Sequence, residues 1–254
     1  MRIDAFAKLT LSLHVTGVRP DGYHEIEAVM VSVTEPYDVV TVEPASRTSL
    51  VVTGPFAAGV PADASNLAWR AADAVGASVA IRVHKGIPHG AGLGGGSADA
   101  AAVLVALGAD ASVGATIGAD VPFCMRGGAA RVRGVGDVIE PIAGPDLWVL
   151  VATPRFGCAT ADVYRAWDAL GGPRAEVNDL EPAAHEVEPR LGPFKAVVEA
   201  AAGAPAFLAG SGSSYAVAFE RGADAERART RVADAVDGNV WCGRTTGAGG
   251  APLP

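Results

Sequence analysis

The chain has 254 residues, of which 50% are hydrophobic and 19% are charged, a balance typical of a globular protein with a sizeable core. Its formal net charge of −8 argues against a role at nucleic acids or at an anionic membrane surface. No apolar run approaches the roughly 18 residues of a membrane-spanning helix, and charged residues within the first eight do not fit a signal peptide. Three widely spaced cysteines form no metal-binding pattern, so we expect reduced thiols and a cytoplasmic protein.

Periodicity in the first half of the chain predicts strands interrupted by two helices. The pattern favours strands over 6–15, 24–33, 38–42, 49–53, 79–83 and 129–132, and helices over 66–75 and 98–107. Gly76 fits the C-terminal cap of the first helix, and the turn at 134–137 closes this half.

The second half predicts a β-α-β-β-α-β order. Strands are expected over 147–152, 206–209, 215–219 and 239–245, and helices over 160–170, 194–202 and 223–236. This order is the ferredoxin-like arrangement with an additional helical insertion. We therefore predict an α+β protein with two domains, residues 1–144 and 145–246, followed by a flexible glycine- and proline-rich tail, 247–254.

The most informative segment is residues 87–102, where five glycines lie within the seven residues 90–96, between a strand and an alanine-rich helix. Glycine lacks a Cβ atom, so successive backbone N–H groups can converge on a bulky anion. The helix that follows adds its unpaired amides and the positive end of its dipole. Ser97, with Asp99 in the first turn, is expected to begin that helix. The segment predicts a phosphate-binding loop.

The same loop contains a formal dinucleotide-binding fingerprint, Gly90, Gly92 and Gly95, with the acid Asp110 twenty residues after the first glycine. A Rossmann fold places that acid at the end of a second buried strand. Here the helix is expected to end near Gly108, which leaves no room for that strand, so the dehydrogenase interpretation is disfavoured. The P-loop and protein-kinase motifs are also absent from the sequence.

Three further segments accompany the glycine loop: residues 7–11 (Ala-Lys-Leu-Thr-Leu) with 21–24 (Asp-Gly-Tyr-His), 117–123 (Ile-Gly-Ala-Asp-Val-Pro-Phe) and 208–214 (Leu-Ala-Gly-Ser-Gly-Ser-Ser). Together they resemble the GHMP superfamily of galactokinases, homoserine kinases, mevalonate kinases and phosphomevalonate kinases. Within it they are most similar to the 4-diphosphocytidyl-2-C-methyl-D-erythritol kinases, in order from residue 7 to about 219.

The resemblance implies a two-domain GHMP-kinase fold, with a ribosomal-S5-domain-2-like nucleotide domain and a ferredoxin-like C-terminal domain. It also implies ATP-dependent phosphorylation of the acceptor's 2-hydroxyl group in the non-mevalonate isoprenoid pathway. The implied partner is a cytidine-diphosphate-linked polyol, bound by a monomer or weak homodimer. A sister kinase with another hydroxylated substrate, or a non-catalytic ligand-binding homologue, remains an alternative.

Two residues carry the implied chemistry. Taken alone, Asp120 could cap the helical turn that follows it, and Lys8 could extend from its strand to the surface. The resemblance instead implies that Asp120 accepts the proton of the acceptor hydroxyl and that Lys8 pairs with Asp120 and with the acceptor oxygen. A neighbouring ammonium lowers the pKa of a carboxyl and weakens it as a base. Phosphoryl transfer tolerates this, because its loose transition state depends on positioning and charge stabilisation.

The resemblance places ATP along the glycine loop. Asn66 and Lys85 would lie on the adenosine side, although Asn66 could equally begin a helix. Ser97 is a candidate contact for Mg²⁺, for which the sequence offers no obvious ligand. Gly210 and Gly212 should bring backbone close to the loop, with a plain hairpin as the alternative. The residues expected to hold the phosphates are Gly90, Gly92, Leu93, Gly94, Gly95, Gly96 and Ser97.

The resemblance also implies residues that bind the acceptor. Tyr23 and His24 match residues that stack on and hydrogen-bond to cytosine, and Tyr164 would supply the second face of that sandwich. Arg165 would lie near the diphosphate, and Val135 would add a backbone contact.

Two residues of the acceptor end depart from the family pattern. Thr10 stands where the family usually has Asn, which removes an amide donor toward the acceptor, and Arg165 replaces a usual Lys. Both departures concern the acceptor and not the phosphates.

Overall fold

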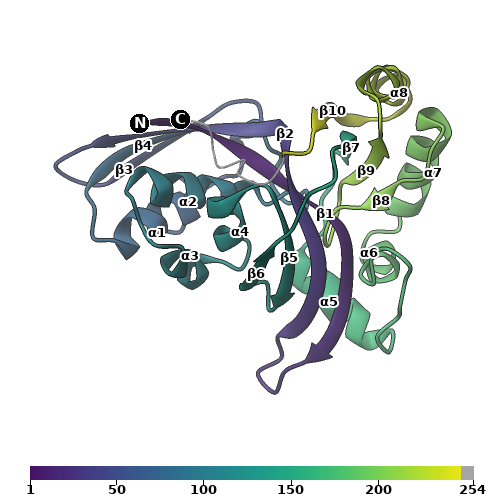
Figure 1. The fold of residues 1–254 in the computed structure, drawn as a ribbon, viewed down its shortest axis with the longest axis horizontal. Helices are drawn as coiled ribbons and strands as arrows, with labels where there is room; N and C mark the ends of the chain where they lie inside the picture. The colour runs from purple at the N-terminus through teal and green to yellow at the C-terminus, as the bar shows by residue number, and fades with distance from the viewer. Residues whose placement is uncertain (247–254) are drawn as a thin grey trace.

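The computed structural model describes residues 1–246, and the predicted tail, 247–254, lies outside the described residues. The chain forms two sheets, each with its own set of helices (Figure 1). Within the described residues no helix is both long and apolar enough to cross a membrane. The thiols of Cys124, Cys158 and Cys242 are free.

The first sheet has six strands in the order β3-β4-β2-β5-β6, with β1 paired to β2. Only β3 and β4 pair in parallel; the other pairs are antiparallel. The strands are β1 (Arg2–Val18), β2 (His24–Pro44), β3 (Ser49–Thr53), β4 (Val79–His84), β5 (Ala129–Gly134) and β6 (Val138–Pro141).

The two strands predicted over 24–33 and 38–42 form the single long strand β2, so the predicted break is wrong. Its pairing with β1 shifts there: Phe6 pairs with Tyr37, whereas Ala7 pairs with Val33. The bulge at 34–36 accommodates Pro36, which has no N–H to donate to the ladder. A proline therefore marks an irregularity within β2 and not its end.

Four helices cover one face of this sheet: α1 (Leu67–Ala74), α2 (Gly95–Ala106), α3 (Ala111–Ile117) and α4 (Val121–Arg126) (Figure 1). The sequence did not predict the short helix α3, and it indicated α4 only as a helical turn after Asp120. Helix α2 is central and buried over most of its length, and it begins two residues before the predicted Ser97. Gly94 takes the N-cap position with φ +69°, because the glycines themselves make the turn into the helix. Asp99 is turned into the core.

The second sheet is antiparallel in the order β10-β7-β9-β8, which is the predicted ferredoxin-like topology. Helices α5, α6 and α7 lie between its first two strands in the chain, and α6 was not predicted. The elements are β7 (Trp148–Pro154), α5 (Thr160–Ala169), α6 (Glu181–Val187), α7 (Leu191–Ala202), β8 (Phe207–Leu208), β9 (Tyr215–Phe219), α8 (Gly222–Ala235) and β10 (Gly238–Arg244).

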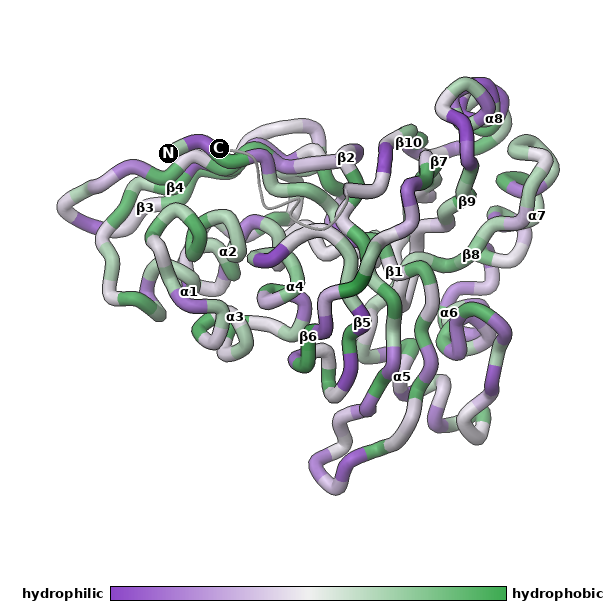
Figure 2. The backbone as a smooth tube through the Cα atoms, viewed as in Figure 1, coloured by the Kyte–Doolittle hydropathy of each residue, from purple (hydrophilic) through white to green (hydrophobic). Residues whose placement is uncertain are grey.

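A buried cluster joins the two halves. It packs Leu9 of β1 and Val31 of β2 against Val151 of β7, together with Leu93 of the glycine loop. The run of hydrophobic residues in β2 shows as green in Figure 2. The glycine loop is therefore anchored by its own apolar side chains at the junction of the two sheets.

Candidate active site

A cavity of about 980 Å³ lies where the two halves meet, at the upper end of the range for small-molecule sites. Its walls come from β1, the β1–β2 hairpin, the glycine loop, the start of α4, the first turns of α5 and the loop between β8 and β9. Of the sequence-predicted site residues, all except Thr10 line it within the described part of the chain.

The glycine loop takes a conformation that other residues would adopt with difficulty. Gly90, Gly92 and Gly94 all have positive φ, at +70°, +77° and +69°. The amide of Lys8 donates to the carbonyl of Leu93 at 3.1 Å, which fixes the loop to β1. The 12-residue helix α2 follows directly, so its free amides and dipole open onto the cavity next to the loop. This arrangement suits an anionic ligand.

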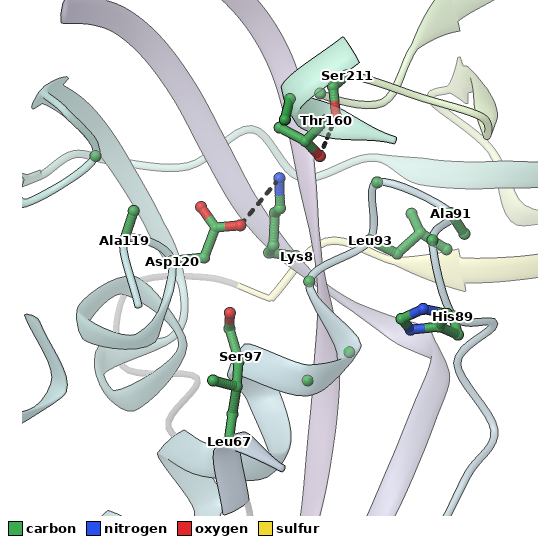
Figure 3. Close-up of a pocket in the computed structure, with 18 of the residues that line it drawn as sticks. Lys8, Leu67, His89, Ala91, Leu93, Ser97, Ala119, Asp120, Thr160 and Ser211 are labelled. Atoms are coloured by element: carbon green, nitrogen blue, oxygen red, sulfur yellow. Dashed lines mark hydrogen bonds and ion pairs between the residues drawn. The ribbon is translucent and has the colours of Figure 1, made fainter. Parts of the chain in front are cut away.

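Lys8 and Asp120 lie next to each other in the cavity, with their charged ends facing (Figure 3). The Lys8 Nζ atom lies 3.5 Å from Asp120 Oδ2 and 3.3 Å from Thr10 Oγ1, to which it donates. The separation from Asp120 exceeds that of a charge-assisted hydrogen bond, so both groups retain bonding capacity toward a third group. Lys8 is 6% exposed, and the Asp120 side chain makes no capping hydrogen bond to α4 in the structure of residues 1–246. Lys8 is therefore not a surface lysine, and Asp120 occupies the N-cap position of α4 while its carboxylate stays free of the helix amides.

The loop between β8 and β9 packs directly on the glycine loop. The amide of Ser214 donates to the carbonyl of Ala91 at 3.2 Å, and a Cβ on Gly92 would lie 2.2 Å from the carbonyl oxygen of Ala209. A Cβ on Gly210 would lie 3.2 Å from Lys8 Nζ. The prediction that this second loop brings backbone close to the glycine loop is confirmed. The loop also closes the hairpin of β8 and β9, so the two alternatives hold together.

Sequence reasoning missed a hydroxyl pair on the opposite wall. Thr160, the first residue of α5, and Ser211 approach within 2.8 Å through their Oγ atoms, near Lys8 (Figure 3). It also missed Asn178, whose Nδ2 donates to the carbonyls of Leu208 and Gly210 and so holds the second loop in place. Only the Asn-Asp-Leu turn before α6 could have signalled this residue, as a helix-capping sequence.

Lys85 forms a buried ion triad at the entry to the glycine loop. Its Nζ donates to Asp38 and, at 2.6 Å, to Asp99 of α2. Asp38 Oδ1 also accepts from the amides of Gly86 and Ile87 at 2.7 and 2.8 Å. Burial alone would lower the pKa of Lys85, but the charges of Asp99 and Asp38 raise it above its ordinary value. Burial raises the pKa of Asp99 well above its usual range, with Lys85 opposing.

The triad ties β2, the loop entry and α2 together, so much of the bonding capacity of Lys85 is used within the protein. Its contact with adenosine stays a prediction. Asn66 is similarly engaged: its Oδ1 accepts from the amide of Ala68 and its Nδ2 donates to the carbonyl of Pro61. It is the N-cap of α1, the alternative that its sequence left open, and its contact with the base also stays a prediction.

The acceptor end differs from a simple sandwich around a base. The ring of Tyr164 lies 4.7 Å from that of His24, at 35°, whereas Tyr23 is 64% exposed on the hairpin. His24 Nε2 lies 2.8 Å from Asp168 Oδ1, a partner that sequence reasoning missed. Burial and, secondarily, the charge of Asp120 raise the pKa of Tyr164 to about 12, so its hydroxyl stays neutral.

Of the other residues predicted for this end, two line the cavity and one does not. Arg165 lines the cavity rim and pairs with Asp162, and Val135 lines the cavity from the turn between β5 and β6. Thr10 is 1% exposed and is absent from the cavity wall of the described chain. Because β1 turns its hydroxyl inward, Thr10 contacts the ammonium of Lys8.

Comparison with known proteins agrees with this architecture. The sequence model of the family "GHMP kinases N terminal domain" matches residues 66–128 of this chain. The chain is 40% identical to the 4-diphosphocytidyl-2-C-methyl-D-erythritol kinase of Paracoccus denitrificans, over 89% of this chain and 90% of that one. It is 34% identical to the enzyme of the same name from Brucella melitensis, over 90% and 89%. A crystal structure of 4-(cytidine 5'-diphospho)-2C-methyl-D-erythritol kinase superposes with TM-score 0.81 and 33% identity, over 97% and 100% of the two chains.

Proposed function

The chain belongs to the 4-diphosphocytidyl-2-C-methyl-D-erythritol kinase family, and from this premise we propose that it transfers the γ-phosphate of ATP to the tertiary 2-hydroxyl of 4-diphosphocytidyl-2-C-methyl-D-erythritol. The products are the 2-phosphate and ADP. The observation that carries the proposal is the Lys8–Asp120 pair, which lies in one cavity with the glycine loop and the start of α2.

In the proposed reaction the backbone amides of the glycine loop and the dipole of α2 hold the β- and γ-phosphates. Asp120 orients the acceptor hydroxyl and takes its proton late, when the O–P bond is forming. Lys8 offsets negative charge on the attacking oxygen and on the carboxylate. Thr10 accepts a hydrogen bond from Lys8 and so restricts where its ammonium can go. Rate enhancement then comes from alignment and charge, since the transition state is loose.

Mg²⁺ is expected with ATP, where it would neutralise charge on the β- and γ-phosphates. Within residues 1–246, no group of three or more His, Cys, Asp or Glu side chains could hold a metal ion. The cation would therefore be bound mainly by phosphate oxygens and water, as Mg²⁺ commonly is at nucleotide sites. The hydroxyl of Ser97, which lines the cavity and lies below Asp120 in Figure 3, would be its candidate side-chain contact.

We assign the cytidine end of the acceptor to the far part of the cavity, where His24, Tyr164, Arg165 and Val135 lie. The proposal further places the enzyme in the cytoplasm, on the non-mevalonate route to isoprenoid precursors, as a monomer or weak homodimer. Residues 1–144 would bind the nucleotide and residues 145–246 would complete the acceptor side. Gel filtration coupled to light scattering checks the oligomeric state.

A substrate panel tests the function. ADP release by the purified protein is measured with the cytidyl compound, galactose, homoserine and mevalonate; only the cytidyl compound is expected to support turnover. Equal rates with all four, or none with the first, would contradict the proposed substrate.

Variants of the reacting pair test the mechanism. Asp120→Asn and Lys8→Met should each reduce turnover by about 100-fold or more, with ATP affinity by calorimetry nearly unchanged. Asp224→Asn, which removes an exposed carboxylate on α8, is the control and should keep normal turnover. Near-normal rates in either site variant would remove that residue from the mechanism.

A further inference from the structure

The imidazole of His24 is held in one orientation by a single face of α5. Tyr164, Trp167 and Asp168 occupy positions i, i+3 and i+4 of this helix, which lie on one side of it. The Tyr164 ring packs against the imidazole at 4.7 Å with a tilt of 35°, and the Trp167 ring meets it edge-on at 5.6 Å and 86°. Trp167 is itself fixed, because its Nε1 donates to the carbonyl of Pro173 at 3.0 Å. The ring of His24 is therefore clamped on its face and at its edge.

Asp168 determines which nitrogen of this ring carries the hydrogen. Its Oδ1 lies 2.8 Å from His24 Nε2, and a carboxylate can only accept, so Nε2 must be the protonated nitrogen. Nδ1 of the neutral ring is then a hydrogen-bond acceptor. Among residues 1–246 no hydrogen bond to Nδ1 is formed, and His24 lines the cavity, so Nδ1 is the nitrogen available to a ligand.

We propose that Asp168 is a positioning residue that makes the site select a cytidine over a uridine in the acceptor, by fixing the Nε2–H tautomer of His24. Cytosine carries an exocyclic amino group that can donate to Nδ1, whereas uracil presents a carbonyl oxygen at the corresponding position. Two acceptors facing each other leave both without a partner, and such mismatches discriminate strongly in a desolvated site. The inference rests on the proposed function, because it concerns the base of that acceptor.

The location of the pair fits this role. The imidazole side chain is 9% exposed and the Asp168 carboxylate is 47% exposed, and both residues line the cavity. Asp168 occupies the Nε2 side of the ring, which leaves the Nδ1 side for the base. His24 begins β2 at the end of the hairpin, and Asp168 lies at the end of α5, which runs beside this hairpin in Figure 1. The hydrogen bond thus joins elements of the two halves at the acceptor end.

The experiment compares wild type with Asp168→Ala and Asp168→Asn. Long-range ¹H–¹⁵N spectra at pH 8 report the tautomer of His24, whose signals are assigned by their loss in His24→Gln. Turnover is measured with the cytidyl acceptor and with its uridyl analogue. We expect a single Nε2–H tautomer in wild type and a mixture of both tautomers in Asp168→Ala. The cytidyl-to-uridyl ratio of kcat/KM should fall at least 10-fold in Asp168→Ala, with the KM for ATP nearly unchanged.

Asp168→Asn keeps an oxygen that can accept from Nε2, so it should retain most of the tautomer and of the ratio. Asp162→Ala is the matched control, because it removes a carboxylate of similar exposure (45%) from the same helix. It should alter neither readout.

An unchanged tautomer, or an unchanged substrate ratio, in Asp168→Ala would overturn the inference. If wild type turns over neither acceptor, the proposed function fails. The spectra then still test the Asp168–His24 coupling, and calorimetry with cytidine and uridine 5′-diphosphate tests the selection.

Discussion

Replacing Gly92 by alanine would test whether the two loops at the site act as one unit. Gly92 has φ +77°, and an added Cβ would lie 2.2 Å from the carbonyl oxygen of Ala209 and 2.8 Å from that of Gly212. Gly90 in the same loop has φ +70°, but among the described residues nothing lies within 4 Å of its Cβ position. Alanine costs roughly 1–2 kcal/mol at either position through the left-handed backbone alone. The pair of variants therefore isolates the contact between the loops.

The contact between the added Cβ and the Ala209 carbonyl oxygen determines how much more Gly92→Ala costs than Gly90→Ala. Cβ atoms essentially never approach other atoms closer than 3.0 Å, so the Ala209 carbonyl would have to retreat by about 0.8 Å. Overpacking of this kind costs about 1–3 kcal/mol. The displaced loop carries Gly210, which lies against the ammonium of Lys8. A misplacement of about 1 Å in a reacting constellation can cost roughly 100-fold in rate.

Urea unfolding and steady-state ADP release measure the two effects. Gly90→Ala should lose about 1–2 kcal/mol of unfolding free energy, with a moderate loss of kcat/KM. Gly92→Ala should lose about 2–5 kcal/mol, the sum of the backbone and overpacking costs, and about 100-fold in kcat/KM. If the two variants behaved alike in both assays, the mechanical coupling of the loops would be refuted.

Three further substitutions probe the supports of the site. Lys85→Met leaves two buried carboxylates without a counter-charge and should cost about 3–5 kcal/mol in urea unfolding; a loss below about 1 kcal/mol would contradict the triad. Thr10→Val removes the acceptor for Lys8 and should lower kcat about 10-fold, with Thr10→Ser restoring it. Burial raises the pKa of Asp179, but hydrogen bonds from two amides, an arginine and a histidine hold that pKa below the ordinary aspartate value of 3.8. Its stabilisation is therefore present above that pH and lost below it, and Asp179→Asn should flatten this acid dependence of urea unfolding.

Local signals in the sequence predicted much of the fold. Alternation and turn residues located most strands, and the β-α-β-β-α-β order gave the second sheet correctly. The errors occurred where a local signal had two structural solutions. The break predicted after residue 33 is a bulge of β2 that contains Pro36, and Ser97 suggested a helix start although Gly94 already makes that turn. At β2 the pairing with distant residues of β1 decides the outcome, and at α2 the turn made by the glycines does.

At the site, too, local motifs could be predicted from the sequence, whereas contacts between distant residues could not. The order of the motifs, through their resemblance to known kinases, predicted that Lys8, Asp120 and the glycine loop belong to one site, and they line one cavity. The partners of Lys85 and His24 could not be read in this way. Asp38 is 47 residues from Lys85, and Asp168 is 144 residues from His24. Such pairs arise only when the sheet and the helices are assembled.

The charges of the cavity indicate how it holds an anionic nucleotide. In the part of the chain that the structure describes, its cationic wall residues are Lys8, Lys85 and Arg165, and each pairs with a carboxylate. A wall whose cations are already paired offers little net positive charge to a triphosphate. The affinity must then come largely from directed amides of the glycine loop and the dipole of α2. Because these are short-range contacts in a partly enclosed cavity, added salt should screen them far less than it screens surface charges.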